Sequence, residues 1–423
     1  MRDILVTLLV FGSLPFILRH AYIGVLAWSW LSYMNPHRLT WGFAYDMPFA
    51  QIVAITLFIA LIFSKDKKEI PVNGSFFVWL LFILWMLVTT WQAIFPDAAM
   101  VMYTKIFKIQ IVIFLTMLLI TNHEKINQLI WVIVGSIGYF SLKGGMFTLL
   151  TGGGFRVYGP PDSYISENNA LAVATLMIIP LMVYLYHIAV NKWVRYGLIF
   201  TIIMSLVSVV GSQSRGAFLA IIAVAGFFWL KTKSKILSGL VIILFAGLGL
   251  AFMPESWHER MDSIQNYEED ESAMQRINSW SYGINVANAR LTGGGLSSWA
   301  PKSFAMYAPD PDTVFAAHSI YFSVLGDHGW PGLILFLVIL GLTWKNLSNV
   351  IKQTKKEVGS QQNYLARMLQ VSLIAYMSGG AFLSMSYFDL FWHLFAISLL
   401  LNYQLNTRKE NTEPGQLASS ISS

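Results

Sequence analysis

Long apolar runs constrain the fold of this chain more than any other feature of its sequence. A run of about 20 mostly apolar residues is long enough to cross the hydrocarbon core of a bilayer. Candidate runs follow one another at 4–34, 47–64, 75–95, 104–121, 127–150, 165–188, 193–212, 216–231, 235–253, 319–344, 362–386 and 388–406. Charged residues make up only 12% of the 423 residues, too few to coat a soluble protein of that size. The sequence therefore predicts an all-α polytopic membrane protein with about 12 transmembrane helices, and it excludes a soluble enzyme, a coiled coil and a disordered scaffold.

The first run, 4–34, is too long for one span and too short for two comfortable ones. Pro15 and the polar pair Arg19-His20 interrupt it, so we expect a broken helix or a short hairpin. No small-residue cleavage site follows, and we expect the segment to be retained. Whether it crosses the membrane once or twice stays open at this point.

Positive charges mark every second connection between the runs. These charges are Lys65, Lys67, Lys68, Lys125, Lys192, Arg195, Lys231, Lys233, Lys235, Lys345, Lys352, Lys355, Lys356, Arg408 and Lys409. By the positive-inside rule these connections are cytoplasmic, and the intervening loops face outward. Both termini then lie inside if 4–34 crosses once, whereas a hairpin there places the N-terminus outside.

The spacing of the runs predicts four regions. They are an N-terminal transmembrane bundle 1–253, an outward loop domain 254–318, C-terminal transmembrane helices 319–406 and a disordered cytoplasmic tail 407–423. Within the loop domain, residues 272–290 carry apolar residues at helical spacing, which predicts an amphipathic helix lying on the membrane. The glycines 293–295 then end it, and no strand–turn–helix pattern around them indicates a dinucleotide site.

The outward face should be poor in Lys and Arg, so its cations are candidates for binding an anion. They are Arg38, Lys105, Lys108, Arg156, Arg215, Arg260, Arg276, Arg290 and Lys302. Arg215 lies in a tight turn, where the helix that starts at Gly216 points its N-terminus outward. A helix N-terminus and a guanidinium both suit phosphate oxygens. The alternative is an interfacial arginine that anchors to lipid headgroups.

Arg276 and His318 are further candidates in the outward loop. Arg276 lies early in the expected amphipathic helix, and a solvated surface residue is its alternative role. His318 ends the loop at the start of the run 319–344, where a group with a near-neutral pKa can act as a general base or be a plain interfacial residue. Lys105, Lys108 and Arg156 are secondary candidates for an anionic lipid group.

Other ionisable residues lie within the runs. Asp327-His328 could hold a kink together, and Asp389 with His393 could be a functional pair or merely satisfy each other one turn apart. The chain has no cysteine, which excludes disulfides and thiolate chemistry. Its net charge of +6 is weak evidence for nucleic-acid binding in a membrane protein, and we expect no nucleic-acid partner.

An ordered set of short motifs resembles one family of envelope enzymes. The set comprises Ser214-Arg215-Gly216-Ala217, Arg276 with Trp280, Thr292-Gly293-Gly294-Gly295-Leu296, His318-Ser319 and Gly326-Asp327-His328-Gly329-Trp330-Pro331-Gly332-Leu333. This order resembles the O-antigen ligase and Wzy-C-type polymerase superfamily over roughly 210–335, with a matching topology elsewhere. The first 39 residues are similar to the O-glycosylation ligases associated with exosortase systems. Ser319 is a departure, since many members have Asn there.

The resemblance implies an inverting, metal-independent glycosyltransferase in the bacterial inner membrane, with its active site facing the periplasm. It implies an undecaprenyl-diphosphate-linked glycan as donor and lipid A–core or another acceptor, with no cofactor. O-antigen ligation to lipid A–core in lipopolysaccharide biosynthesis is the favoured interpretation. His318 would be the base, and Arg215 and Arg276 would hold the diphosphate. Because charge develops on phosphate oxygens as they leave, preorganised cations fit this chemistry.

Other functions stay open at the level of sequence. An O-antigen polymerase or a protein O-glycosylation ligase would share the donor and differ in the acceptor. A polytopic lipid or solute transporter is compatible with the intramembrane residues Lys143, Asp327, Asp389 and His393, but the two related halves common among transporters are absent from the sequence. A structural subunit of an envelope complex is the third class.

Overall fold

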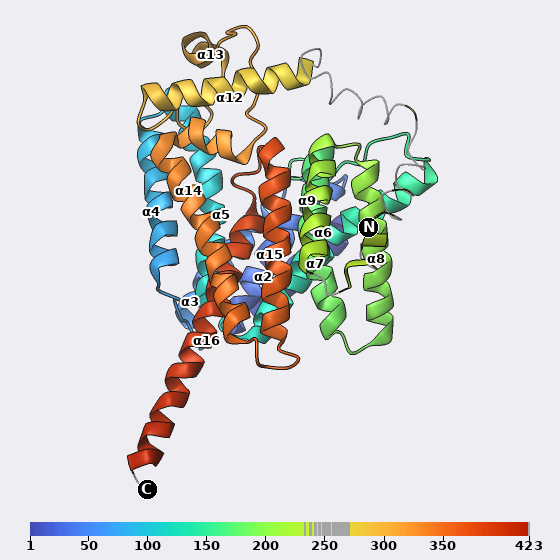
Figure 1. The fold of residues 1–423 in the computed structure, drawn as a ribbon, viewed down its shortest axis with the longest axis vertical. Helices are drawn as coiled ribbons and strands as arrows, with labels where there is room; N and C mark the ends of the chain where they lie inside the picture. The colour runs from blue at the N-terminus through green and yellow to red at the C-terminus, as the bar shows by residue number, and fades with distance from the viewer. Residues whose placement is uncertain are drawn as a thin grey trace.

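The structure is a computed structural model that describes residues 1–231, 234–236, 239–240, 243, 247, 255 and 271–421, with the side chains of 215, 231 and 408–421 left out. Every regular element in these ranges is a helix (Figure 1). The elements are α1 (Arg2–Arg19), α2 (Ala21–Met34), η1 (Pro36–Leu39), α3 (Phe49–Phe63), α4 (Gly74–Trp91), α5 (Pro96–Leu119), α6 (His123–Leu150), α7 (Asn168–Ile188), α8 (Lys192–Gly211), α9 (Arg215–Lys231), α12 (Glu271–Ala289), α13 (Pro301–Tyr307), α14 (Ile320–Gln353), α15 (Gln361–Gly379), η2 (Gly380–Phe382) and α16 (Asp389–Ile421).

Six of the described helices, α4, α5, α6, α7, α8 and α14, are long and apolar enough to cross a membrane. The predicted all-α class is confirmed for the described part of the chain. Its long apolar helices are those of a multi-pass membrane protein. The apolar segments Phe49–Phe63 and Gly216–Leu230 are shorter. The full number of crossings stays a prediction, and the expected run 235–253 lies mostly outside the described residues, as does Arg260.

The first apolar run forms a helical hairpin. Helix α1 passes through Pro15 without ending, and the chain breaks instead at His20, whose backbone is extended (φ −135°). The start of α1 lies beside the end of α2, because the Asp3 carboxylate accepts hydrogen bonds from the backbone N–H groups of Gly42 and Ala44. At the other end, His20 contacts Asp66 at 3.4 Å. Of the two expected forms, the structure therefore has the hairpin.

The connections sort to two ends of the bundle. We call one the loop-rich end, and its loops are 35–48, 92–95, 151–167, 212–214, 290–319 and 380–388. Hydrogen bonds join them there, for example from Ile94 N–H to Gly294 O at 2.8 Å and from Gln213 Nε2 to Gly153 O at 2.9 Å. At the opposite, basic end lie the loops 64–73, 120–122, 189–191 and 354–360, with Glu69 N–H bonded to Leu118 O. Of the lysine-rich connections predicted to share one side, the described loops 64–73, 120–122, 189–191 and 354–360 thus lie at one end.

Helix α12 lies across the loop-rich end, over the ends of α4, α5 and α14 (Figure 1). It matches the helix expected at 272–290. Its exposed apolar face carries Met274, Ile277 and Ile284, as an interfacial helix requires. Its other face packs inward, with Tyr282 stacked on Phe304 at 4.4 Å between ring centroids.

Helix α14 is broken at Gly329 (φ 66°, ψ −173°), nine residues after its start at Ile320. The Asp327 carboxylate accepts hydrogen bonds from Trp299 Nε1 at 2.8 Å and from Tyr387 Oη at 2.9 Å. The His328 ring lies between Tyr387 Oη and Thr89 Oγ1, each at 2.7 Å. This buried set, which we call the kink network, has the role at the kink that the sequence suggested for Asp327-His328.

Helix α16 differs from the sequence prediction in two respects. Asp389 and His393 do not pair through their side chains. The Asp389 carboxylate accepts a hydrogen bond from Ser32 and the His393 ring bonds to Tyr33 Oη at 2.6 Å, so each is satisfied by α2. The backbone stays helical to Ile421 and projects beyond the bundle (Figure 1), whereas disorder was expected over 407–423.

Candidate active site

A polar cavity of about 110 Å³, which we call the arginine pocket, opens at the loop-rich end. It is lined by Arg156, Asn168, Asn169, Gln213, Ser214, Gly216, Ser272, Arg276, Phe382 and Leu383. Two guanidinium groups and no carboxylate are among these lining residues. The pocket therefore has the charge and the hydrogen-bonding groups of an anion site.

Two helix N-termini contribute to the arginine pocket. Helix α7 begins with Asn168, and α9 begins at the turn after Ser214, whose Oγ caps the helix by accepting a hydrogen bond from Ala217 N–H at 3.1 Å. Asn168 Nδ2 donates to Ser212 O at 2.7 Å and so joins the two helix starts. Free N–H groups and the positive ends of helix dipoles add to the attraction for an anion.

Helix α12 positions Arg276 and also binds the segment that precedes His318. In the turn after Arg276, Ser279 Oγ donates to Phe315 O at 2.9 Å, and Trp280 Nε1 donates to Ala317 O at 2.8 Å. Because one helix sets both residues in register, a shift of α12 would move the guanidinium and the imidazole together.

His318 is held in an unusual backbone conformation. Its φ of 42° lies in the left-handed region, where a residue other than glycine persists only if its surroundings enforce it. Its backbone N–H donates to Ser384 Oγ at 3.0 Å. The atoms His318 Nδ1 and Ser319 Oγ are buried and have no hydrogen-bond partner among the described residues. A buried polar atom without a partner in the protein is a candidate to bind a substrate group.

The electrostatic surroundings of His318 keep its ring neutral. Burial is the larger cause that lowers the pKa of His318 below its usual value of 6.5, and the positive charge of Arg276 lowers it further. The carboxylate of Glu167 acts in the opposite direction. A neutral imidazole at pH 7 is the form that accepts a proton, so the ring is competent as a general base.

The structure brings some of the predicted site residues together and leaves others apart. Arg276 and Arg156 line the arginine pocket; His318 does not line it, although the charge of Arg276 acts on the His318 ring. The backbone of Arg215 begins α9 beside the pocket residue Gly216, while its side chain lies outside the described residues. Lys105 and Lys108 are exposed on α5 and do not line the pocket.

Glu167, Asn168 and Asn169 are site residues that the sequence reasoning missed. A signal was available, because polar residues directly before a long apolar run are typical of a helix start. Their place next to α9 depends on the packing of the bundle, which the local sequence does not specify. Within the described part of the chain, no group of three His, Asp or Glu side chains is arranged to hold a metal ion.

Comparison with known families adds to this geometry. Residues 1–190 match the model of a family of unknown function, and residues 199–337 match the family model described as O-Antigen ligase. No curated protein matches the chain. The second match contains Arg215, Arg276, His318 and the kink of α14. It supports the resemblance predicted from the sequence: residues 199–337 of this chain are similar to the O-antigen ligase superfamily.

Proposed function

We propose that the protein is an inverting, metal-independent glycosyltransferase of the bacterial inner membrane. It transfers a glycan from undecaprenyl diphosphate to an acceptor hydroxyl, and O-antigen ligation to lipid A–core is the favoured reaction. The loop-rich end faces the periplasm, since the basic end carries the lysines that the positive-inside rule keeps in the cytoplasm. The similarity of residues 199–337 to the O-antigen ligase family supports glycan transfer as the general activity.

The donor diphosphate would occupy the arginine pocket. When the bond between the anomeric carbon and the diphosphate oxygen breaks, negative charge grows on the leaving group. Arg276, Arg156 and the N–H groups at the starts of α7 and α9 are in place before the reaction, so they stabilise this charge without reorganising. Arg215 would add a further guanidinium from the first turn of α9. Lys105 and Lys108 remain predicted secondary contacts.

His318 would take the proton from the acceptor hydroxyl as its oxygen attacks the anomeric carbon. Attack from the face opposite to the diphosphate inverts the anomeric configuration. A neutral base beside a cationic pocket suits this step, because Arg276 favours the unprotonated imidazole before the acceptor arrives. Ser319 Oγ could share in binding the acceptor hydroxyl, although many relatives have Asn at that position.

The observation that carries this proposal is the placement of Arg276, with Arg156 and two helix N-termini, within electrostatic reach of His318 at one end of the bundle. A polymerase or a protein O-glycosylation ligase would use the same donor site. These alternatives therefore differ from the proposal only in the acceptor.

Reconstitution with defined acceptors tests the proposal. Purified protein in liposomes is given an undecaprenyl-diphosphate-linked glycan with lipid A–core, with a second donor molecule, or with a peptide containing Ser and Thr. We expect glycosylated lipid A–core to form, with the same rate in the presence of EDTA. Product only with the second donor molecule would identify a polymerase, product only with the peptide would identify a protein ligase, and no product with any acceptor would contradict glycan transfer.

A further inference from the structure

A second cavity, of about 280 Å³, lies at the loop-rich end and has no role in the function proposed above. Helix α2 and the start of α16 form much of its wall, together with the loop 151–167. Four aromatic side chains line it: Trp28, Tyr33, Tyr164 and Phe388. We call it the aromatic pocket. Small-molecule sites are typically of at least about this size, mostly apolar, with a few polar groups in fixed places.

The charges of the aromatic pocket are opposite to those of the arginine pocket. Its lining includes the carboxylates of Asp162 and Asp389 and no lysine or arginine. The lining offers phosphate oxygens no cationic partner, and Arg38 beside Asp162 is already paired with carboxylates, so the donor diphosphate fits the arginine pocket better. Carboxylates accept hydrogen bonds readily, so a ligand with several O–H groups fits this pocket.

The buried end of the aromatic pocket is polar. Asp389 is only 7% exposed, and its carboxylate accepts a hydrogen bond from Ser32, whose side chain also lines the cavity. A buried carboxylate beside a lipid acyl chain would be costly, because the chain offers it no hydrogen bond. A sugar ring suits both the aromatic and the polar part of this lining, since it presents C–H groups to aromatic faces and hydroxyls to the carboxylates.

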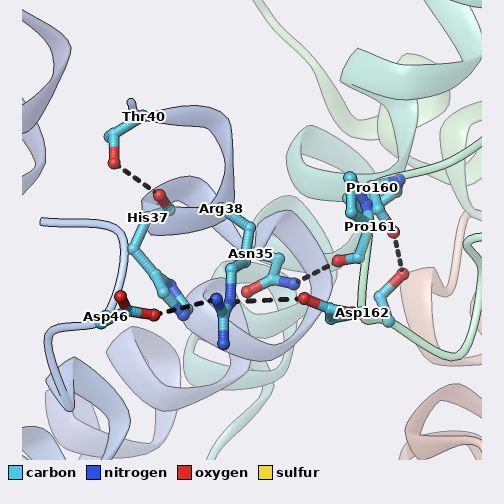
Figure 2. Close-up of polar contacts among 9 residues, drawn as sticks. Asn35, His37, Arg38, Thr40, Asp46, Pro160, Pro161 and Asp162 are labelled. Atoms are coloured by element: carbon cyan, nitrogen blue, oxygen red, sulfur yellow. Dashed lines mark hydrogen bonds and ion pairs between the residues drawn. The ribbon is translucent and has the colours of Figure 1, made fainter. Parts of the chain in front are cut away.

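The rim of the aromatic pocket is held in place by polar contacts (Figure 2). Arg38 lies between two carboxylates, with Nη1 at 3.3 Å from Asp46 Oδ1 and Nε at 3.7 Å from Asp162 Oδ2. Asn35 Nδ2 donates to Pro161 O at 3.0 Å. These contacts fasten the loop 151–167 to the segment at the end of α2 and so fix the shape of this side of the cavity. They also give a role to Arg38, one of the cations noted on the outward face.

The two pockets share the segments that separate them. The loop 151–167 contributes Arg156 to the arginine pocket and Tyr164 to the aromatic pocket. The segment before α16 contributes Leu383 to the first and Phe388 to the second, and Ser384 between them bonds to the backbone of His318. A substrate with an anionic part and a sugar part could therefore be recognised on both sides of these segments.

We propose that the aromatic pocket is a sugar-binding site that holds an uncharged sugar unit of a glycan substrate. This inference rests on the proposed function, which supplies the glycan. The sugar unit could come from the donor glycan or from the acceptor, because the chemistry of the pocket is the same for both. Most of its residues belong to the segment 1–190, which matches a family of unknown function.

Binding of simple probes to the full-length protein in detergent tests the inference. The neutral probes are the methyl glycosides of glucose, galactose and N-acetylglucosamine, followed by saturation-transfer NMR, and the anionic probe is inorganic pyrophosphate, followed by calorimetry. Tyr164→Ala and Asp389→Asn should each weaken binding of at least one glycoside roughly tenfold, the effect of one lost hydrogen bond or ring contact. Pyrophosphate binding should be unchanged in both, which also shows that the variants fold.

Matched controls come from the same end of the molecule. Tyr158 is exposed on the same loop as Tyr164, and Asp97 is exposed on the first turn of α5. Neither lines a pocket, so Tyr158→Ala and Asp97→Asn should bind the glycosides as the wild type does. Arg276→Gln should lose pyrophosphate and keep the glycosides.

The outcomes separate this inference from the proposed function. If no glycoside binds the wild type, or if both pocket variants bind as tightly as the controls, the sugar site is overturned. If the glycosides bind and pyrophosphate does not, the proposed diphosphate site is contradicted and the sugar site is not. In the transfer assay, a raised KM of Tyr164→Ala for the acceptor assigns the pocket to the acceptor, and a raised KM for the donor assigns it to the donor. An unchanged KM for both would also overturn the inference.

Discussion

At the scale of single residues, His318 depends on groups that are distant in sequence. Arg276 and burial favour its neutral form, and Glu167 at the start of α7 favours the protonated form. The backbone of His318 lies in the left-handed region, and its N–H group donates a hydrogen bond to Ser384 Oγ. The reactivity of this histidine is therefore a property of three helix starts, α7, α12 and α14, rather than of its own motif.

Replacement of Glu167 tests this electrostatic balance. Because the Glu167 carboxylate raises the pKa of His318, Glu167→Gln should lower it. The unprotonated base would then persist to lower pH, so the acid limb of the profile of kcat/KM against pH should move to lower pH. Glu124→Gln, at the exposed start of α6 on the basic end, should leave the profile unchanged. An acid limb that stays in place or moves to higher pH would show that Glu167 does not act on the base.

At the scale of elements, the break in α14 fixes the outward loop to the bundle. The backbone N–H groups of Gly294 and Gly295 donate to Gly326 O at 2.8 Å and to Asp327 O at 3.1 Å. An added Cβ at Gly329 would collide with the carbonyl oxygen of Leu291, and its φ of 66° is strained for any other residue. The kink network thus holds the loop close to the segment that follows His318.

Gly329→Ala should therefore destabilise the protein and reduce activity with it. Left-handed strain and the collision together should lower the free energy of unfolding by at least about 2 kcal/mol. Gly341→Ala lies in the same helix, where an added Cβ meets nothing within 4 Å, and it should be neutral or slightly stabilising. Thermal unfolding in one detergent compares the two variants. Equal midpoints would contradict the role given to Gly329.

The sequence predicted the elements better than their contacts. Apolar length located the helices, and amphipathic spacing located α12, because both depend on residues near in the chain. Pro15 was expected to interrupt the first run, yet the helix continues to Arg19 and the extended His20 breaks it. The partners of Asp389 and His393 lie on α2, some 360 residues away. Such pairs depend on how the bundle packs, and local spacing cannot indicate them.

The candidate site shows the same division. Motif order pointed to Arg276 and His318, and the structure places them within electrostatic reach of each other. Arg156, a secondary candidate, lines the same pocket as Arg276, whereas Lys105 and Lys108 do not. All four are cations on the expected outward face. The sequence could not separate Arg156 from Lys105 and Lys108, because the difference lies in whether the loop 151–167 or α5 brings each side chain to the pocket.

At the scale of the whole molecule, the two ends of the bundle differ in chemistry. The basic end carries Lys65, Lys67, Lys68, Lys355 and Lys356 in its loops, and the loop-rich end carries both pockets. The α1–α2 hairpin places the start of α1 at the loop-rich end. We therefore expect residue 2 to lie on the same side of the membrane as the long loop.

The absence of cysteine makes this orientation simple to test. Single variants Arg2→Cys and Trp41→Cys report on the loop-rich end, and Val358→Cys, at a fully exposed position, reports on the basic end. In intact spheroplasts, a membrane-impermeant maleimide should label the first two and should label Val358→Cys only after permeabilisation. The reverse pattern would invert the topology. Labelling of Trp41→Cys without Arg2→Cys would contradict the hairpin.

The most direct measurement of the central claim separates donor binding from transfer in one variant. His318→Asn removes the titrating base and keeps a residue that tolerates the left-handed backbone. We expect His318→Asn to bind the undecaprenyl-diphosphate-linked glycan as tightly as the wild type but to transfer it at least about 100-fold more slowly. His187→Ala, at the basic end, should transfer normally. If His318→Asn binds the donor and transfers the glycan as fast as the wild type, the assignment of His318 as the base is contradicted.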